Sequence, residues 1–495
     1  MLFNSLQYLV FLPTVFLLYW LLPHKLRVPL LLVASYVFYC SWRPIYGLLI
    51  FGLTLANFLM VPFIDKAAKA ESGKHIFSPK MWLGITVATN LILLGVFKYA
   101  YFTVGTIKQG LSLAGIDWKE PHLHIILPLG ISFFVFEFIH YAVEVYRGKP
   151  VVKDFQALAL FAGFFPTQIA GPIKRYQDFV PQLSEKFKFK WEYVDEGMQM
   201  ILMGLAKKVL LADNLALVVQ AGFSHPENFS SVDLWLITYA FAFQIFFDFA
   251  GYTDVARGSA LLFGYKVPIN FNLPYLAANP ADFWNRWHIS LSTWLRDYLF
   301  IPLGGSRCTR PVLYRNLFIT MALGGLWHGA AMHFLAWGVY QGVVLILHRE
   351  YERIMGAVGL VQKIKDSAMA SKIYHAVSVV VTFHIVCIGW VLFRADDLKL
   401  AGAIITKLVQ APVELLHFSA AQLAILQIRD PIIFPALILL LPGLMISHLV
   451  VNWLNDKAFY KSPPWAVQVS VMVALMCLLT IFSPDSSPRF IYFQF

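Results

Sequence analysis

The sequence is poor in charged residues, in cysteine and in recognisable cofactor motifs. Only 14% of its 495 residues are Asp, Glu, Lys or Arg, whereas soluble domains are about a quarter charged. The four cysteines are far apart and form no CxxC pair, so neither a disulfide framework nor a zinc site is indicated. No P-loop, GxGxxG, GxSxG or HExxH motif supports nucleotide hydrolysis, dinucleotide redox, α/β-hydrolase or zincin chemistry. We therefore predict no bound metal or cofactor.

Apolar residues, by contrast, make up 59% of the chain, and 16% of the residues are aromatic. Apolar runs recur from residue 6 to residue 483 without an extended polar stretch between them. The runs are continuous rather than alternating, and a bilayer requires each spanning segment to close its own backbone hydrogen bonds, so they predict helices and not barrel strands. The predicted fold class is all-α: a polytopic transmembrane helical bundle that forms a single domain over 1–495.

The apolar runs also give the expected positions of the membrane helices. Several are shorter than the roughly 20 residues that a perpendicular helix needs to cross a bilayer, so we expect about ten to thirteen membrane helices, some of them half-helices or fused pairs. The expected runs are 6–22, 28–40, 44–63, 81–104, 123–146, 197–222, 232–250, 312–328, 331–348, 373–393, 431–453 and 464–483.

Two stretches fit neither an ordinary membrane helix nor an ordinary loop. Residues 161–172, FAGFFPTQIAGP, are apolar but interrupted by glycine and proline, which predicts a re-entrant segment buried in protein. Residues 247–305 mix Trp, Arg, Asp, Asn and Pro at a density that a lipid-facing helix does not tolerate, so we expect them to line a cavity. No internal repeat is visible, and the inverted-repeat pattern of many transporters is therefore missing.

Loop charges predict the orientation in the membrane. Residues 1–23 contain no Lys or Arg, and the first cations are Lys25 and Arg27, which predicts an N-terminus outside the cell. The stretch 147–190, with eight Lys or Arg against three acids, then falls on the cytoplasmic side. We attribute the formal charge of +11 to this topology rather than to nucleic-acid binding. The first run lacks a basic segment before it, and we expect it to be retained as a helix.

A single histidine stands out in the C-terminal half. His328 lies in the sequence LWHGA, between two apolar runs. A histidine at membrane depth either hydrogen-bonds a backbone carbonyl as a structural residue or marks a site, and the pattern alone leaves both open. Gly324, Gly325 and Gly329 beside it allow a substrate or another backbone to approach closely. A lone imidazole suits general-base catalysis, because it can take a proton from a hydroxyl that attacks a thioester.

The segment FWNRWHISLSTWLRDYLFIPLGG, residues 283–305, holds further polar candidates. On a helix Trp284, Trp287 and His288 share one face. For the tryptophans the simpler interpretation is an interfacial helix at the level of the headgroups. His288 and Arg286 are more open to a functional role.

Acidic residues also occur in the apolar run that precedes this segment. Asp248 and Asp254 each need a cation, a hydroxyl or a helix N-terminus. We expect them to be structural partners of the nearby arginines rather than catalysts. The candidate partners are Arg257, Arg286 and Arg296.

Together these motifs resemble the membrane-bound O-acyltransferases (MBOAT), and in particular the bacterial alginate O-acetyltransferases. The resemblance rests on DFAGYTD at 248–254, NFNLPY at 270–275, the long segment at 283–305 and GGLWHGA at 324–330, with further similarity in the opening LFNSLQYLVFLPTVFLLYWLLP and the closing FIYFQF. It implies membrane helices around a central funnel, with a catalytic core at about 125–350 and C-terminal helices at about 373–495. It also implies an essential histidine matching His328 and a second matching His288. The residues we expect to position substrate are Trp284, Asn285, Arg286, Trp287, Trp327 and Asp248.

The resemblance implies an enzyme in the bacterial inner membrane that moves acetyl groups from cytoplasmic acetyl-CoA toward an extracytoplasmic polysaccharide such as alginate. Membrane lipid, acetyl-CoA, the polysaccharide and periplasmic SGNH-hydrolase-like proteins are its expected partners, and nucleic acid is not. The alternatives are O-acylation of peptidoglycan or cellulose, D-alanylation of teichoic acid, a transporter or flippase, and a non-catalytic scaffold.

Overall fold

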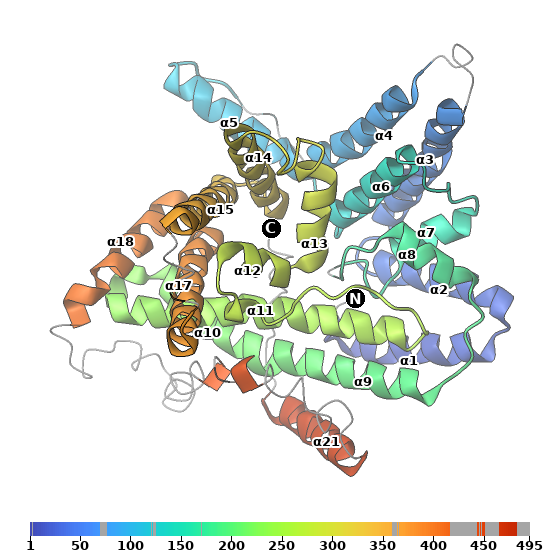
Figure 1. The fold of residues 1–495 in the computed structure, drawn as a ribbon. Helices are drawn as coiled ribbons and strands as arrows, with labels where there is room; N and C mark the ends of the chain where they lie inside the picture. Colours follow the sequence, from blue (N-terminus) through green and yellow to red (C-terminus); the bar gives the residue numbers. More distant parts are fainter. Residues whose placement is uncertain are drawn as a thin grey trace. The chain divides into compact units, whose positions relative to one another are not determined.

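The computed structural model is helical, and no β-strand occurs in the part of the chain that it describes (Figure 1). The predicted all-α class is therefore confirmed. The described residues divide into two compact units, Met1–Gly204 with Tyr252–Ile269 and Leu205–Gly251 with Asn270–Phe495. The structure describes residues 1, 3–69, 77–119, 121, 125–169, 171–358, 364, 366–415, 443–444, 446, 448–450 and 465–482.

The first unit is a group of helices from the N-terminal part of the chain. Within it α3 packs on α4 and α6, and α2 packs on α7. Serine side chains begin two of the helices, because Ser5 accepts a hydrogen bond from the Tyr8 amide at 3.3 Å and Ser78 accepts one from the Met81 amide at 3.3 Å. The helices are α1 (Leu6–Leu21), α2 (His24–Cys40), α3 (Ile45–Lys69), α4 (Pro79–Leu94), α5 (Ala100–Leu113), α6 (Ile131–Tyr146), α7 (Phe155–Gly163), α8 (Tyr176–Phe179) and α9 (Trp191–Leu205).

The interrupted apolar stretch predicted at 161–172 lies inside this unit. Helix α7 ends at Gly163, and the backbone that follows is non-helical. Phe164 and Phe165 are fully buried, and the Phe165 amide donates to the Ser35 hydroxyl at 3.0 Å. The segment is thus broken and enclosed by protein, as its glycines and prolines predict.

A buried ion pair fixes the end of that stretch. The Lys174 ammonium lies 2.8 Å from a carboxylate oxygen of Glu137 on α6 and 2.7 Å from the Thr167 hydroxyl, and both charged side chains are less than 5% exposed. A buried charge is stable only when it is paired and hydrogen-bonded. The pair therefore ties the re-entrant segment to α6.

The second unit contains the remaining helices. Helix α14 packs on α15, α15 on α17, and α17 on α18 (Figure 1). Apolar side chains from α15, α17 and α18, together with α10 and the N-terminal part of α11, form its core. The helices are α10 (Asp213–Ser224), α11 (Ser231–Leu261, whose last turns belong to the first unit), α12 (Pro280–Arg286), α13 (Ile289–Leu295), α14 (Arg310–His328), α15 (Met332–Val358), α17 (Ala368–Arg394), α18 (Leu398–Leu415) and α21 (Trp465–Phe482).

Most of the expected apolar runs correspond to helices, with differences at the ends. In the described part of the chain four helices are long and apolar enough to cross a membrane, Ile45–Lys69, Pro79–Leu113, Ser231–Leu261 and Ala368–Arg394. The total number of membrane crossings stays a prediction. Most of the run expected at 431–453 and the closing FIYFQF lie outside the described residues.

Helix α18 was not among the expected runs. Its buried residues Ala401, Ile404, Leu408 and Ala411 recur every three or four positions, and the other residues of the helix include Lys399 and Lys407. This is the pattern of an amphipathic helix. A search for continuous apolar runs misses such a helix because only one face is apolar.

We predict that removing Glu137 destabilises the first unit. Glu137→Ala leaves the Lys174 ammonium buried without its carboxylate, a change that costs about 3–5 kcal/mol. Thermal unfolding of the purified protein in detergent should show a clear fall in Tm. The double variant Glu137→Leu/Lys174→Met, which removes both charges, should recover most of the loss; equal Tm values for the two variants would contradict the explanation.

Candidate active site

His328 is the last residue of α14 and is almost fully buried, with 5% of its surface exposed. Three aromatic rings surround its imidazole. The ring centroids of Trp327, Trp337 and Phe393 lie 5.0, 5.1 and 5.3 Å from that of His328, and each ring is nearly perpendicular to it. Edge-to-face contacts of this kind fix the orientation of a ring. The enclosure is built from α14, α15 and α17, so three helices hold this one imidazole.

Glycines allow the first two of these helices to approach closely. A Cβ on Gly325 would lie 2.8 Å from the Cα of Gly338 and would also overlap the backbone oxygen of Phe334. A Cβ on Gly329 would overlap the Phe334 ring. The sequence predicted close approach of a substrate or of a backbone at these glycines, and the structure shows the neighbouring helix there. Gly338 contributes equally to the crossing and was not singled out from the sequence.

His288 lies at the start of α13 in an unusual backbone conformation. Its φ of 42° and ψ of 54° are left-handed, which costs a residue with a Cβ roughly 1–2 kcal/mol. Its ring is fully buried and packs edge-on against Phe249, with the centroids 4.7 Å apart. Strained backbone that persists in a buried position often belongs to a functional site.

The two histidines contact the same side chain. The His288 ring lies 6.0 Å from the Trp327 ring, which is also the neighbour of His328 in the chain and in space. His288 lies between α12 and α13, outside the four helices that are long and apolar enough to span a membrane. Burial lowers the pKa of its imidazole to about 3. The ring is therefore neutral at physiological pH. The structure thus brings His288, Trp327 and His328 together.

The expectation that Trp284, Trp287 and His288 share one helix face is wrong. Helix α12 ends at Arg286, Trp287 is extended, and α13 begins only after His288. Trp287 is 1% exposed and lies against Trp390, with ring centroids 4.8 Å apart. The helix breaks because the backbone turns through the left-handed His288, so Trp287 enters the core instead of a membrane interface.

Residues of the NFNLPY motif hold this break in place. The backbone oxygen of Asn270 accepts from the Ile289 amide at 3.0 Å, and its side-chain oxygen accepts from the Ser290 amide at 3.2 Å. The Asn272 amide donates to the Arg286 oxygen at 3.0 Å. The two motifs therefore form one local structure, which explains why they occur together.

The polar residues expected to position substrate differ in their surroundings. Trp284 is half-buried, and its ring lies 5.9 Å from that of Trp337. Asn285 is exposed. Arg286 is partly exposed and pairs with Asp282 at 2.8 Å, one turn earlier on α12. Of these three, the structure places only Trp284 against the aromatic enclosure of His328.

Asp248 is buried in a group of charges that the sequence did not predict. The Lys208 ammonium lies 2.9 Å from an oxygen of Asp248 and 2.5 Å from an oxygen of Asp213, and all three side chains are less than 5% exposed. Lys208 belongs to a π-helical segment, Ala206–Ala212, between α9 and α10. The expected arginine partner was wrong for Asp248. For Asp254 it was correct, because Asp254 lies 3.6 Å from Arg257. The sequence feature that could have predicted this partner is a lysine within the apolar run at 197–222.

Comparison with known proteins identifies the class of protein that carries this site. Residues 142–389 match the MBOAT, membrane-bound O-acyltransferase family. The chain is 37% identical over 468 residues to the probable alginate O-acetylase AlgI of Pseudomonas aeruginosa, and the aligned region covers 94% of this chain and 83% of that protein. It is 31% identical over 543 residues to the peptidoglycan O-acetyltransferase of Helicobacter pylori, covering 100% and 98% of the two chains. It is 32% identical over 289 residues to the teichoic acid D-alanyltransferase of Bacillus subtilis, covering 55% and 70%.

The protein is thus a helical membrane acyltransferase. More particularly, the chain belongs to the membrane-bound O-acyltransferase family, MBOAT. The transporter and scaffold interpretations of the sequence are therefore set aside.

We predict that Gly325→Ala disrupts the α14–α15 crossing. The added methyl group overlaps backbone atoms of Phe334 and Gly338, which cannot rotate away as a side chain can, and overpacking of this kind costs about 1–3 kcal/mol. Gly324→Ala is the matched control, because its Cβ meets only the end of the Leu295 side chain at 3.1 Å. Unfolding temperatures in detergent should fall for Gly325→Ala and change little for Gly324→Ala. The reverse order would be incompatible with this packing.

Proposed function

We propose that the protein transfers acetyl groups from cytoplasmic acetyl-CoA toward an extracytoplasmic polysaccharide, in the bacterial inner membrane, with His328 as the catalytic base. The observation that carries this proposal is the buried His328 imidazole in its aromatic enclosure, next to the Trp327 that also contacts His288. Periplasmic SGNH-hydrolase-like partners would complete the transfer to sugar hydroxyls. The bacterial relatives named as O-acetylating enzymes support this direction.

Acyl transfer from a thioester to a hydroxyl requires one proton acceptor next to the reacting groups. An acceptor hydroxyl attacks the carbonyl carbon of the thioester, and the carbon–sulfur bond then breaks. His328 takes the proton from the hydroxyl and returns it to the departing thiolate. The apolar rings of Trp337 and Phe393 exclude water from the imidazole, which protects the thioester from hydrolysis. The neutral His288 ring can orient the acceptor or the donor.

Trp337 supplies a candidate donor for the thioester oxygen. Its indole N–H is buried and has no hydrogen-bond partner among the residues that the structure describes. Leaving a buried donor unsatisfied is unfavourable unless a ligand completes it. The ring lies 5.1 Å from that of His328. We therefore assign this N–H to the carbonyl oxygen of the acyl group, where negative charge develops in the transition state.

Alginate is the acceptor that several relatives suggest, and peptidoglycan is the second candidate. The probable alginate O-acetylases of Pseudomonas aeruginosa and Azotobacter vinelandii are each 37% identical to this chain over 94% of its length. The Helicobacter pylori peptidoglycan O-acetyltransferase covers the whole chain at 31% identity. The Bacillus subtilis D-alanyltransferase matches only 55% of it, which favours acetyl over D-alanyl as the acyl group. Mass spectrometry of the purified polymer tests the acceptor and the acyl group together.

We predict that His328→Ala abolishes polymer acetylation. The variant loses the proton acceptor but keeps the helices that surround it, so it should still reach the membrane. The measurement is the acetyl content of the cell-surface or secreted polymer, at matched membrane levels of each protein. His375→Ala on α17, where the side chain is exposed, is the control and should acetylate normally. Normal acetylation by His328→Ala would sink the proposal; His288→Ala, measured in parallel, ranks the second histidine.

We further predict that Trp337→Phe lowers kcat without a matching rise in KM. Phenylalanine keeps an aromatic ring against His328 but lacks the N–H, and loss of one such donor lowers kcat about a hundredfold. Initial rates of acetyl transfer by the purified protein give the two constants. Trp191→Phe, at a site that is 73% exposed, is the control. An unchanged kcat for Trp337→Phe would remove the indole from the mechanism.

A further inference from the structure

The first unit contains a basic cavity that the proposed chemistry does not use. Its volume is about 820 Å³, and its lining includes Lys25, Lys149 and Lys153. The only acid in the lining is Asp154, and one of its oxygens already accepts a hydrogen bond from the Gln156 amide at the start of α7. A cavity of this size falls in the range that holds small-molecule ligands. Its net charge favours an anion.

The wall that carries Lys149 and Lys153 is fixed by two tyrosines. The Tyr176 hydroxyl donates to the Pro150 oxygen at 3.1 Å, and the Tyr141 hydroxyl accepts from the Val152 amide at 3.0 Å. The two tyrosine rings pack edge-on, with centroids 4.9 Å apart. The backbone between the two lysines is therefore held in one conformation, so binding an anion there costs little ordering of the backbone.

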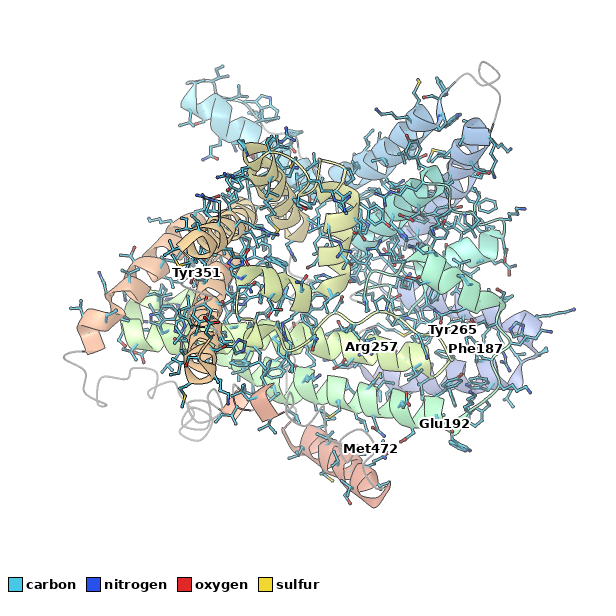
Figure 2. The ribbon with its side chains drawn as sticks, in the orientation of Figure 1. Phe187, Glu192, Arg257, Tyr265, Tyr351 and Met472 are labelled. Atoms are coloured by element: carbon cyan, nitrogen blue, oxygen red, sulfur yellow. The ribbon has the colours of Figure 1, made fainter. Side chains whose placement is uncertain are left out.

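The rest of the lining comes from the first turn of α2, from residues 176–177 and from residues 180–184. The His24 ring is hydrogen-bonded to the Glu185 oxygen at 2.8 Å. Phe187 packs edge-on against Tyr265, with ring centroids 5.4 Å apart (Figure 2). The first turn of α2 contains no acid and no side-chain cap, so the helix dipole adds to the positive potential of the lysines.

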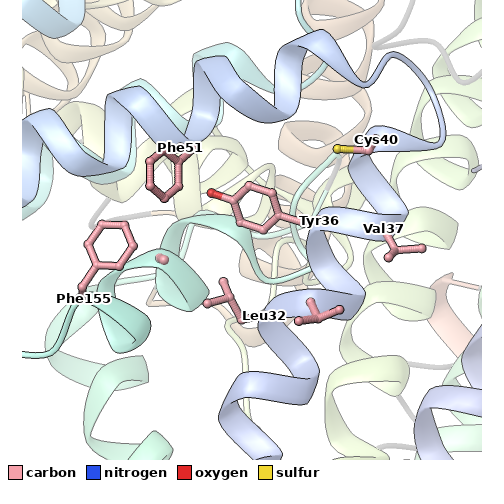
Figure 3. Close-up of a pocket in the computed structure, with 8 residues that line it drawn as sticks. Leu32, Tyr36, Val37, Cys40, Phe51 and Phe155 are labelled. Carbon is pink, nitrogen blue, oxygen red and sulfur yellow. The ribbon is translucent and has the colours of Figure 1, made fainter.

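A separate apolar groove lies further along α2. It has a volume of about 410 Å³ and is lined by residues of α2, α3 and α7, including Tyr36, Phe51 and Phe155 (Figure 3). Positions four residues apart share one helix face. The row His24, Val28, Leu32, Tyr36 and Cys40 runs along α2, lining first the basic cavity and then the groove.

We propose that this site binds an anionic phospholipid, with its phosphate among Lys25, Lys149 and Lys153 and an acyl chain in the groove along α2. From Lys25 to Tyr36 the helix rises roughly 16 Å, so the charged end and the apolar end are separated as they are in a lipid. Basic pockets on the cytoplasmic side of membrane proteins bind anionic headgroups in this way. The predicted topology places Lys25 and the stretch 147–190 on that side, and the structure brings both into one cavity.

The chemistry of the groove distinguishes a lipid from the nucleotide of CoA. Both ligands carry phosphate, and both satisfy the lysines. Only a lipid also fills a groove whose lining is Leu32, Val33, Val37 and similar side chains. The proposal concerns the first unit alone and does not depend on the role of His328.

The test uses the full-length protein in nanodiscs of phosphatidylcholine with or without phosphatidylglycerol, and native mass spectrometry to count the lipids that remain bound. The triple variant Lys25→Gln/Lys149→Gln/Lys153→Gln should lose its preference for phosphatidylglycerol about tenfold, since each partly exposed pair contributes modestly. The matched control replaces three exposed lysines of the same basic stretch that do not line the cavity, Lys186→Gln/Lys188→Gln/Lys190→Gln. It should retain phosphatidylglycerol as the wild type does.

A second pair of variants tests the groove separately from the charges. Val33→Trp fills the groove from an exposed position and should also reduce phosphatidylglycerol retention. Leu26→Trp, on α2 but outside both linings, should not. Equal retention in the pocket and control triples would overturn the proposal. A second result would also overturn it: coenzyme A binds the protein in pure phosphatidylcholine nanodiscs, and the pocket triple abolishes this binding while the control triple does not. The cavity would then be a binding site for the nucleotide.

Discussion

The close crossing of α14 and α15 is the constraint on which the candidate active site depends. Gly325 and Gly338 let the two backbones come within a distance that no side chain permits. Small residues at a helix crossing bring the two backbones into van der Waals contact, which holds the helices together. The crossing places the C-terminal His328 of α14 against Trp337 of α15, and α17 adds Phe393. An imidazole enclosed in this way keeps one orientation and little contact with water.

Buried charged side chains are stabilised by ion pairs with neighbouring residues. Lys174 is paired with Glu137 in one unit, and Lys208 lies between Asp213 and Asp248 in the other. A buried charge without a partner is far more costly than a pair. These pairs account for Glu137, Lys208, Asp213 and Asp248 in the apolar runs without assigning them to transport. They also leave the imidazoles of His288 and His328 as polar groups beside the aromatic rings.

Much of the fold was predictable because apolar runs and helix signals are local in the sequence. The helical class, the break after Gly163 and the position of His328 at the end of a helix all follow from such patterns. The break at His288 did not, because it is held by hydrogen bonds that the Ile289 and Ser290 amides donate to Asn270, which lies 18 positions before His288. Likewise the partner of Asp248 was missed, since Lys208 is near it only after folding. Amphipathic α18 was missed because its apolar residues are spaced rather than continuous.

The central claim is that His328 acts as the base of a thioester-cleaving acyl transfer, and release of free coenzyme A reports that step directly. The measurement is the single-turnover release of thiol from acetyl-CoA by purified wild-type protein and by His328→Ala, with the periplasmic partner and the polysaccharide both present and binding of acetyl-CoA verified for both variants. The account predicts rapid thiol release by the wild type and almost none by the variant that still binds acetyl-CoA. Equal release by the two proteins would contradict it, because the bond would then break without this imidazole.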